Sequence, residues 1–205
     1  ACRRTGAACQ TVPPHAVMKL GLTGTHQEQN AALARASAQE LARLGHPITS
    51  RAVARGLAAA RWPGRWEVIS GRPGIVLDGA HNGSSAVALA ETLRREYGGR
   101  AVHLVIGINA DKDAVAVLRP LLDVCESVTV TASTSPRARA MDDLARACDR
   151  LAAVPVATAP DVGAAITLAR ARAGARDVIC ATGSLALIGE ARSALGLGPL
   201  VQLWE

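Results

Sequence analysis

An acidic side chain and an imidazole lie three residues apart where an apolar stretch of the chain ends. The stretch Ile75–Leu77 is followed by Asp78 and, after two small residues, by His81 and Asn82. In an open α/β sheet, ligands bind in the crevice at the carboxyl ends of the strands. If the stretch is a strand, Asp78 and His81 are therefore presented to that crevice. A polar turn is the alternative interpretation, because Asp, Asn and His are also frequent in turns.

A helix is predicted directly after this stretch. Asn82 or Ser84 is suited to cap its amino terminus, and the free amide groups of the first turn would face the same crevice. Amide groups at the start of a helix attract anions. The segment therefore combines an acid, an imidazole and a potential anion site within a few residues.

Polar residues also follow other predicted strands, and in a parallel sheet they share this edge. Lys112 follows the strand expected at 101–106, and Ser184 follows the strand expected at 177–181. Lys112 is one of two lysines against 21 arginines, which favours a compact charge retained for binding. The alternative is a lysine at a helix start whose charge is offset by two neighbouring aspartates. Ser184 either caps a helix or offers its hydroxyl to a carboxylate.

The composition argues against several classes of function. The 205 residues carry a formal charge of +6, but the arginines are scattered and the chain has one Tyr and no Phe. A stacking surface for single-stranded nucleic acid is therefore not predicted. There is no apolar run of 18 residues, so no membrane span is expected. The five cysteines form no CxxC. This predicts buried, reduced thiols in a cytoplasmic protein. It also predicts no metal site in this chain, because the ligand spacing of such a site is missing.

Three common motifs are absent from these 205 residues. No GxGxxG follows a predicted strand, no GxxxxGK[ST] P-loop is present, and no GxSxG occurs. The usual dinucleotide loop, a P-loop and an α/β-hydrolase nucleophile are therefore not predicted within this sequence.

Hydrophobic periodicity predicts the α/β class: a Rossmann-like, mostly parallel six-stranded sheet with helices on both faces, preceded by two helices. The first helix spans about 27–44, with a capping box of Thr25 and Glu28. The second spans about 49–60 and is capped by Thr49. The expected strands are 66–70, 75–78, 101–106, 127–131, 154–158 and 177–181. The expected later helices are 84–97, 112–123, 140–151, 161–173 and 184–195.

The change of pattern near residue 61 predicts two parts. Residues 61–205 form the Rossmann-like domain, whereas residues 1–60 have the pattern of two helices from an upstream domain. The chain starts at Ala1 without an initiator Met and without the apolar segment of a signal peptide. We expect either a processed chain or the later part of a longer protein.

Five short motifs stand in a fixed order along the chain. They are Gly24-Thr25-His26-Gln27-Glu28-Gln29-Asn30-Ala31-Ala32, Trp62-Pro63-Gly64-Arg65-Trp66-Glu67-Val68, Leu77-Asp78-Gly79-Ala80-His81-Asn82, Gly107 with Asp111-Lys112-Asp113, and Thr182-Gly183-Ser184-Leu185 with Gly189-Glu190. Together they resemble the carboxyl-terminal domain of folylpolyglutamate synthase/dihydrofolate synthase, in the Mur ligase superfamily. The resemblance covers about residues 20–195. The family usually has Pro where this chain has Gly83, which loosens the helix start without removing a functional group.

The resemblance implies an ATP-dependent amide ligase. In that family, ATP phosphorylates a carboxylate of dihydropteroate or of a folate's glutamate tail, and the amine of L-glutamate then attacks the acyl phosphate. The P-loop, the Mg²⁺ ligands and a modified lysine lie in the two preceding domains. Residues 1–60 then correspond to the end of the central ATPase domain. The chain is expected to be inactive without the missing amino-terminal part.

The resemblance also assigns roles to residues of this chain. Asn30 is expected to contact the adenine, and Arg65 the nucleotide phosphates, for which a planar bidentate cation is well suited. Asp78 is expected on the ribose side of ATP. His81 is expected close to the reacting phosphate and amine, so that Asp78 and His81 are the catalytic candidates.

Lys112 and Ser184 match positions that relatives place near the incoming L-glutamate. Other interpretations of the chain remain open. It is alternatively a free-standing module that binds an anionic metabolite or regulates a partner ligase, or an interaction domain in which Asp78 and His81 are structural. A third alternative is another Mur-type amino-acid ligase. Neither nucleic acid nor a membrane is an expected partner.

Overall fold

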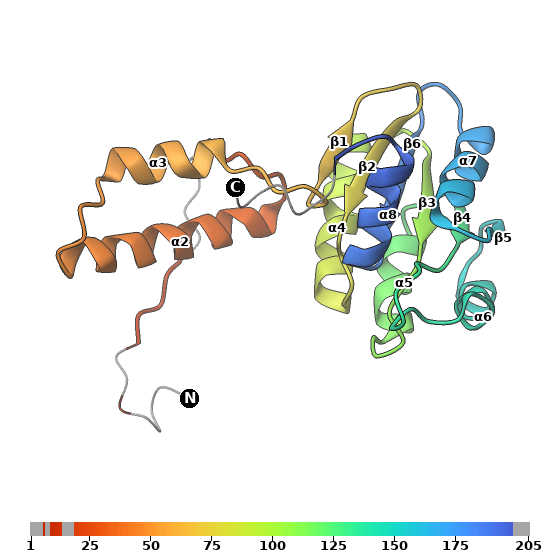
Figure 1. Ribbon diagram of the computed structural model, residues 1–205, viewed down its shortest axis with the longest axis horizontal. Coiled ribbons are helices and arrows are strands. Elements are labelled where there is room, and N and C mark those ends of the chain that lie inside the picture. Colours follow the sequence, from red (N-terminus) through yellow and green to blue (C-terminus); the bar gives the residue numbers. More distant parts are fainter. Residues whose placement is uncertain (1–5, 7–8, 14–18, 199–205) are drawn as a thin grey trace. The chain divides into compact units, whose positions relative to one another are not determined.

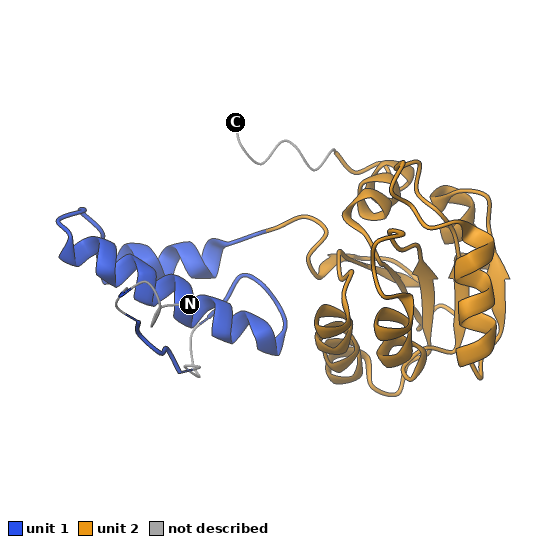
Figure 2. Cartoon of the chain, turned by 90° about the horizontal axis from the view of Figure 1, so that it is seen from below, with its two compact units in different colours: residues 1–61 blue, residues 62–205 orange. Residues whose placement is uncertain are grey.

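A computed structural model describes residues 6, 9–13 and 19–198 of the chain. The chain divides into two compact units, Ala1–Arg61 and Trp62–Glu205 (Figure 2). The first unit is helical, and the second is an α/β domain.

The first unit is a helical hairpin of α2 (Thr25–Arg43) and α3 (Ser50–Ala59) (Figure 1). The amide of Gly21 donates to the carbonyl oxygen of Leu57 at 2.9 Å, which joins the segment before α2 to the last part of α3. The hairpin buries little of itself, because α3 has no buried residue. Large apolar side chains of this unit stay exposed, namely Leu33, Leu41 and Leu44.

The helix starts of this unit agree with the sequence at α3 and differ from it at α2. Thr49 caps α3 as predicted, since its Oγ1 accepts from the amide of Ala52 at 3.1 Å. The capping box predicted for Thr25 and Glu28 is wrong. Thr25 is already helical, and Gly24 precedes it with a φ of 126° and no side-chain cap. A hydroxyl inside the first turn is past the cap position from which it reaches a free amide.

The second unit is built on a six-stranded sheet with strand order β1-β2-β6-β3-β4-β5. The strands are β1 (Glu67–Ile69), β2 (Gly74–Asp78), β3 (Val102–Ile106), β4 (Ser127–Val130), β5 (Val156–Thr158) and β6 (Val178–Thr182). The helices are α4 (Gly83–Tyr97), α5 (Ala114–Leu122), α6 (Met141–Leu151), α7 (Val162–Arg172) and α8 (Leu185–Ala194). The β1 strand pairs antiparallel with β2, and the other pairs are parallel.

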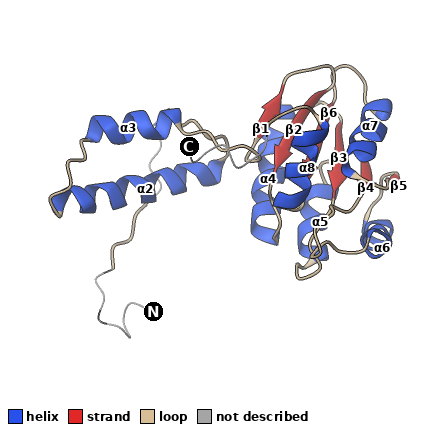
Figure 3. Ribbon diagram, viewed as in Figure 1, coloured by secondary structure: helices blue, strands red, loops and turns tan. Residues whose placement is uncertain are grey.

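Helices cover both faces of the sheet, as Figure 3 shows. The α4, α5 and α6 helices pack on one face, and α7 and α8 pack on the other. The central strand β3 supplies both cores, because successive side chains of a strand point to opposite faces. Leu104 and Ile106 pack with the first group of helices, and Val105 packs with the second.

The chain connections mark one position along the sheet as a crevice. The β6 strand lies between β2 and β3. It is followed by α8 on one face, whereas its two neighbours are followed by α4 and α5 on the other face. Connections that diverge in this way open the crevice in which open α/β sheets bind ligands.

The predicted fold class is confirmed, and each predicted helix and strand of the described residues is present within a few residues of its expected bounds. The three cysteines expected inside apolar segments, Cys125, Cys148 and Cys180, are buried. Burial raises the pKa of the Cys125 and Cys148 thiols to about 12. Within the described residues, no helix combines the length and apolar character needed to cross a bilayer.

Candidate functional site

Three neighbouring strands end side by side at the carboxyl edge of the sheet. The Cα partner of Thr182 at the end of β6 is Asp78 on β2 and Ile106 on β3. The hydroxyl of Thr182 donates to the carbonyl oxygen of Ala80 at 3.2 Å. The backbone carbonyl oxygen of Thr182 accepts from the amide of Gly107 at 3.3 Å. The loops that follow these three strands are therefore tied together at their first residues.

Asp78 fastens the Pro-Gly-Arg turn to the end of β2. One carboxylate oxygen accepts from the amide of Trp66 at 2.8 Å, and the other accepts from the amide of Ala80 at 2.9 Å. In addition, the amide of Gly79 donates to the carbonyl oxygen of Gly64 at 2.8 Å. The two motifs that the sequence presented separately are thus one structural feature.

Arg65 is exposed at the centre of this turn, between the two anchored residues Gly64 and Trp66. The turn needs left-handed backbone conformations, with a φ of 72° at Gly64 and of 46° at Trp66. A residue other than Gly rarely adopts such a φ unless its surroundings hold it there. Trp66 is held by Asp78 and by stacking on Tyr97 of α4, with 5.8 Å between ring centroids. Among the described residues, the Arg65 guanidinium has no hydrogen-bond or ion-pair partner.

His81 has a defined ring orientation. Its Nδ1 lies 2.8 Å from the carbonyl oxygen of Gly79. A carbonyl oxygen only accepts, so Nδ1 carries the proton and Nε2 is the basic nitrogen of the neutral ring. The ring is half-buried beside the start of α4.

Asn82, rather than Ser84, caps α4. Its Oδ1 accepts from the amide of Ser85 at 2.9 Å, and the Ser85 hydroxyl accepts from the amide of Asn82 at 3.1 Å, which completes a capping box. Gly83 is the first residue of α4, and a Cβ there would lie 3.1 Å from the Cβ of Ala116 on α5. This close approach of α4 to α5 gives Gly83 a packing role.

Ser184 is buried at the start of α8, with 2% of its surface exposed. Its Oγ caps the helix by accepting from the amide of Leu187 at 3.1 Å. Gly183 before it has a φ of 112°, and a Cβ there would lie 2.5 Å from the carbonyl oxygen of Gly107. Only Gly fits this approach, which brings the start of α8 against the loop after β3. The capping role of Ser184 is confirmed, and its role toward a ligand stays a prediction.

Lys112 pairs with its neighbour in sequence. Its Nζ lies 2.8 Å from a carboxylate oxygen of Asp111, and a third of its side chain is exposed. The hydrogen bond from Lys112 holds the pKa of the Asp111 carboxyl below its ordinary value. Asp113 instead caps α5 through the amide of Ala116 at 3.0 Å. The charge of Lys112 is thus partly offset, and its role in binding stays a prediction.

Two side chains that sequence reasoning missed shape this edge. Arg139 donates to the carbonyl oxygens of Ala110 and Lys112 at 3.0 and 2.8 Å, and so holds the Lys112 loop from outside. Glu190 of α8 accepts from both the amide and the hydroxyl of Thr134, at 2.7 and 2.8 Å. Nothing distinguished Arg139 among so many arginines, whereas Glu190 stood in a motif but without an assigned contact.

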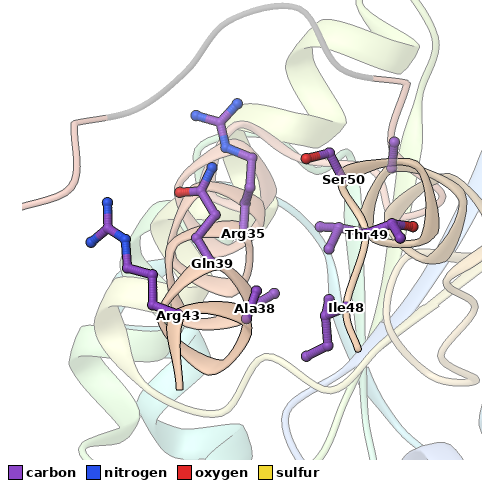
Figure 4. A pocket seen from close by; sticks show the side chains of 10 residues that line it. Arg35, Ala38, Gln39, Arg43, Ile48, Thr49 and Ser50 are labelled. Carbon is purple, nitrogen blue, oxygen red and sulfur yellow. The ribbon is translucent and has the colours of Figure 1, made fainter. Parts of the chain in front are cut away.

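Asn30 lies in the other unit, exposed on α2, where its Nδ2 donates to Oε1 of Gln27 at 3.0 Å. That unit also contains a cavity of about 570 Å³ between the second half of α2 and the start of α3. Arg35, Gln39 and Thr49 are among its lining residues, and Figure 4 shows them around the opening. Asn30 does not line this cavity. Its contact with a nucleotide stays a prediction.

No group of three or more His, Cys, Asp or Glu side chains suited to a metal ion occurs among the residues that the structure describes. The carboxylates nearest the predicted site are occupied by backbone amides at Asp78 and by Lys112 at Asp111. The exposed Arg65 and the starts of α4 and α8 lie at the same edge, and cations and helix starts suit an anionic ligand.

Comparisons with known proteins agree with this geometry. Residues 64–185 match the family model described as the Mur ligase, glutamate ligase domain. The chain is 38% identical over 177 residues to the probable bifunctional folylpolyglutamate synthase/dihydropteroate synthase of Haloferax volcanii. This alignment covers 86% of the present chain and 20% of that protein. It is 36% identical over 196 residues to the dihydrofolate synthase/folylpolyglutamate synthase of Mycobacterium tuberculosis, covering 88% of this chain and 40% of that protein.

A solved structure with the same fold is that of Mycobacterium tuberculosis folylpolyglutamate synthase complexed with ADP. It matches with a TM-score of 0.79 and 37% identity, over 88% of this chain and 42% of that chain. This chain therefore spans less than half the length of the proteins it resembles. The match of the family model to most of the α/β unit shows that the chain belongs to the Mur ligase family and carries its glutamate ligase domain.

Proposed function

We propose that the chain is the carboxyl-terminal part of an ATP-dependent ligase that adds L-glutamate to dihydropteroate or folates through an acyl phosphate. One observation carries this proposal. The turn that presents the exposed Arg65 is hydrogen-bonded to Asp78 and Gly79 at the carboxyl edge of the sheet, beside His81. A cation on a fixed turn, a basic nitrogen and two helix starts at one edge are what an anionic, phosphorylated intermediate requires.

Arg65 binds the phosphates of ATP in this proposal. Its guanidinium is exposed and has no partner of its own among the described residues, so binding a phosphate displaces no existing ion pair. Asp78 holds the turn in place through the amide of Trp66, and in this proposal it also lies on the ribose side of the nucleotide. ATP supplies the phosphoryl group that activates the carboxylate of the pterin substrate.

His81 acts on the incoming amine. The hydrogen bond from Nδ1 to the carbonyl oxygen of Gly79 leaves Nε2 as the basic nitrogen. Nε2 is thereby suited to remove a proton from the ammonium group of L-glutamate, so that the amine is neutral when it attacks the acyl carbon. Phosphate then leaves and the amide bond is complete.

Lys112 and Ser184 hold the carboxylates of L-glutamate. Lys112 brings an ammonium group, paired with Asp111, from the loop after β3, and Ser184 brings a hydroxyl proton at the start of α8. The hydroxyl of Ser184 still has its proton to donate, because its bond to Leu187 uses it as an acceptor. Arg139 keeps the Lys112 loop in place.

The first unit belongs, in this proposal, to the central ATPase domain of the ligase, with Asn30 toward the adenine. The exposed leucines of the hairpin support this, since the apolar surface of a helix is normally covered. The P-loop, the Mg²⁺ ligands and most pterin contacts come from the amino-terminal domains. The assembled enzyme acts in the cytoplasm.

A chimeric ligase tests this function. In it, the present chain replaces the matching 196-residue stretch of the Mycobacterium tuberculosis dihydrofolate synthase/folylpolyglutamate synthase. We expect incorporation of radioactive L-glutamate into dihydropteroate or tetrahydrofolate that requires both ATP and Mg²⁺, and no incorporation by the chain alone. A folded chimera that hydrolyses ATP without ligating glutamate would contradict the proposal.

A further inference from the structure

A partly buried ion pair is linked to the turn that carries Arg65. It joins Glu67, the first residue of β1, to Arg192 on α8, which lie 125 residues apart in the sequence. The side chain of Arg192 is 9% exposed and that of Glu67 is 22% exposed. Neither residue has a role in the site described above.

The two partners use their remaining polar atoms on the backbone. Oε2 of Glu67 accepts from the amide of Gly64 at 2.7 Å. Arg192 donates from Nε and from its second terminal nitrogen to the carbonyl oxygen of Gly198, at 3.1 and 2.8 Å. Arg192 is thus anchored on α8 and on the segment that follows it, and it holds Glu67 in one orientation.

Gly64 is thereby held at both of its polar groups. Its amide donates to Glu67, and its carbonyl oxygen accepts from Gly79. On the other side of Arg65, the amide of Trp66 donates to Asp78. The backbone on each side of Arg65 is therefore fixed from a different direction, by α8 through Glu67 and by β2 through Asp78.

Stability alone gives little reason for such a pair. Burying two charges costs about as much as their attraction returns, and apolar replacements are often neutral or stabilising. A rigid turn, by contrast, keeps a binding group within a fraction of an ångström of its working position. The strained φ at Trp66 shows that this turn does not take its shape from local preference.

We propose that Glu67, held by Arg192, is a positioning residue that sets the turn on which Arg65 meets the nucleotide phosphates. This rests on the proposed function of Arg65. It adds that α8, whose amino terminus Ser184 caps, and the phosphate-binding turn are coupled through one ion pair.

Two variants remove the ion pair. Glu67→Gln keeps the size of the side chain and an acceptor for Gly64 but loses the charge, and Arg192→Met keeps the apolar stem. Glu91→Gln and Arg94→Met are matched controls, since both residues are exposed on α4. Amide hydrogen exchange is measured on the 205-residue chain, and the KM for ATP and for glutamate is measured on the chimeric ligase.

We expect both Glu67→Gln and Arg192→Met to speed amide hydrogen exchange at Gly64 by about tenfold and to leave exchange in β3 unchanged. In the chimeric ligase, both variants should raise the KM for ATP about tenfold, while the KM for glutamate stays within twofold. The controls change neither quantity. Unchanged exchange at Gly64, or exchange that speeds up equally throughout the sheet, would overturn the proposal. If Arg192→Met does not fold, Glu67→Gln decides alone.

Arg65→Ala separates this proposal from the function on which it rests. If Arg65→Ala leaves the KM for ATP unchanged while Glu67→Gln still frees the Gly64 amide, Arg65 is not the phosphate ligand but Glu67 sets the turn. If Arg65→Ala raises that KM and Glu67→Gln alters neither exchange nor KM, the phosphate role stands and the positioning role of Glu67 is wrong.

Discussion

Asp78 and Trp66 are twelve residues apart in the sequence, yet the carboxylate of one accepts the backbone amide of the other at 2.8 Å. This bond joins the end of β2 to the turn before β1. It also fixes a residue whose φ of 46° is unusual for a tryptophan. A carboxylate at the ligand edge therefore has a structural task in addition to any contact with a ligand.

Replacing Asp78 by Ala removes two hydrogen bonds from backbone amides and should lower the free energy of unfolding by about 2 kcal/mol. A buried bond to a charged acceptor contributes about 1.5–3 kcal/mol, and each bond contributes less here because the site is half-buried. Asp78→Asn retains one acceptor oxygen and should lose less. Urea denaturation measures both. Asp149→Ala, an exposed change on α6, is the control, and equal stability of Asp78→Ala and this control would contradict the structural role.

The approach of Gly183 to Gly107 predicts a second stability effect. Gly183→Ala combines a positive φ with a Cβ 2.5 Å from the carbonyl oxygen of Gly107. Gly99→Ala is a matched control, because its φ is 83° but nothing lies within 4 Å of the added Cβ. The control should cost about 1 kcal/mol from backbone strain and Gly183→Ala clearly more than about 2 kcal/mol. Equal midpoints in guanidinium denaturation would show that the loops can separate at no cost.

A buried histidine near the amino end of β3, His103, predicts that the stability of the chain depends on pH. His103 lies 2.9 Å from the Ser127 hydroxyl through Nδ1 and 3.2 Å from the Asp177 carboxylate through Nε2. The amide of Gly174 and the ring of His103 both hold the pKa of Asp177 below its ordinary value. The ionised form is thus favoured in the folded chain, and its stabilising effect is present above the unfolded pKa and lost as the pH falls through the folded value.

Asp177→Asn should therefore be less stable than the wild-type chain at pH 6, with a difference that shrinks as the pH drops below about 4. Thermal unfolding between pH 3 and 7 measures this. Asp142→Asn, at an exposed site on α6, accounts for general charge effects. A difference between wild type and Asp177→Asn that grew on acidification would reverse the assigned sign.

Arg139 predicts an effect confined to glutamate. Because it donates to the carbonyl oxygens of Ala110 and Lys112, Arg139→Met should loosen the Lys112 loop and raise the KM for glutamate about fivefold in the chimeric ligase, which corresponds to about 1 kcal/mol. The KM for ATP should stay constant. Arg150→Met, exposed on α6, is the control. A change in the KM for ATP of the same size would show that Arg139 acts on the whole edge.

The alternation of apolar runs with amphipathic segments was enough to predict the sheet and its helices. The rule that ligands bind at carboxyl ends of strands placed Asp78, His81, Lys112 and Ser184 on one edge. These predictions depend on patterns of neighbouring residues, which sequence carries directly. The choice of Asn82 over Ser84 as the cap of α4 also depends on neighbours, but it needed the side-chain geometry of Ser85.

Other features depend on pairs far apart in the chain. The bond between Glu67 and Arg192 spans 125 residues, and one arginine among 21 gives no signal of its own. The start of α2 was misplaced because Thr25 and Glu28 match a capping box locally, whereas Gly24 takes a backbone conformation that the pattern does not reveal. Sequence therefore predicted which residues share the edge, and the structure showed what holds them.

The kcat/KM for ATP of the chimeric ligase that carries Arg65→Ala tests the central proposal most directly. Loss of the cation that meets the phosphates should lower kcat/KM for ATP about a hundredfold. The melting temperature should stay unchanged because the side chain is exposed. Arg94→Ala, also exposed, should leave kcat/KM within twofold. If Arg65→Ala ligates L-glutamate with the wild-type kcat/KM for ATP, this edge of the sheet is not the phosphate-binding wall of a ligase.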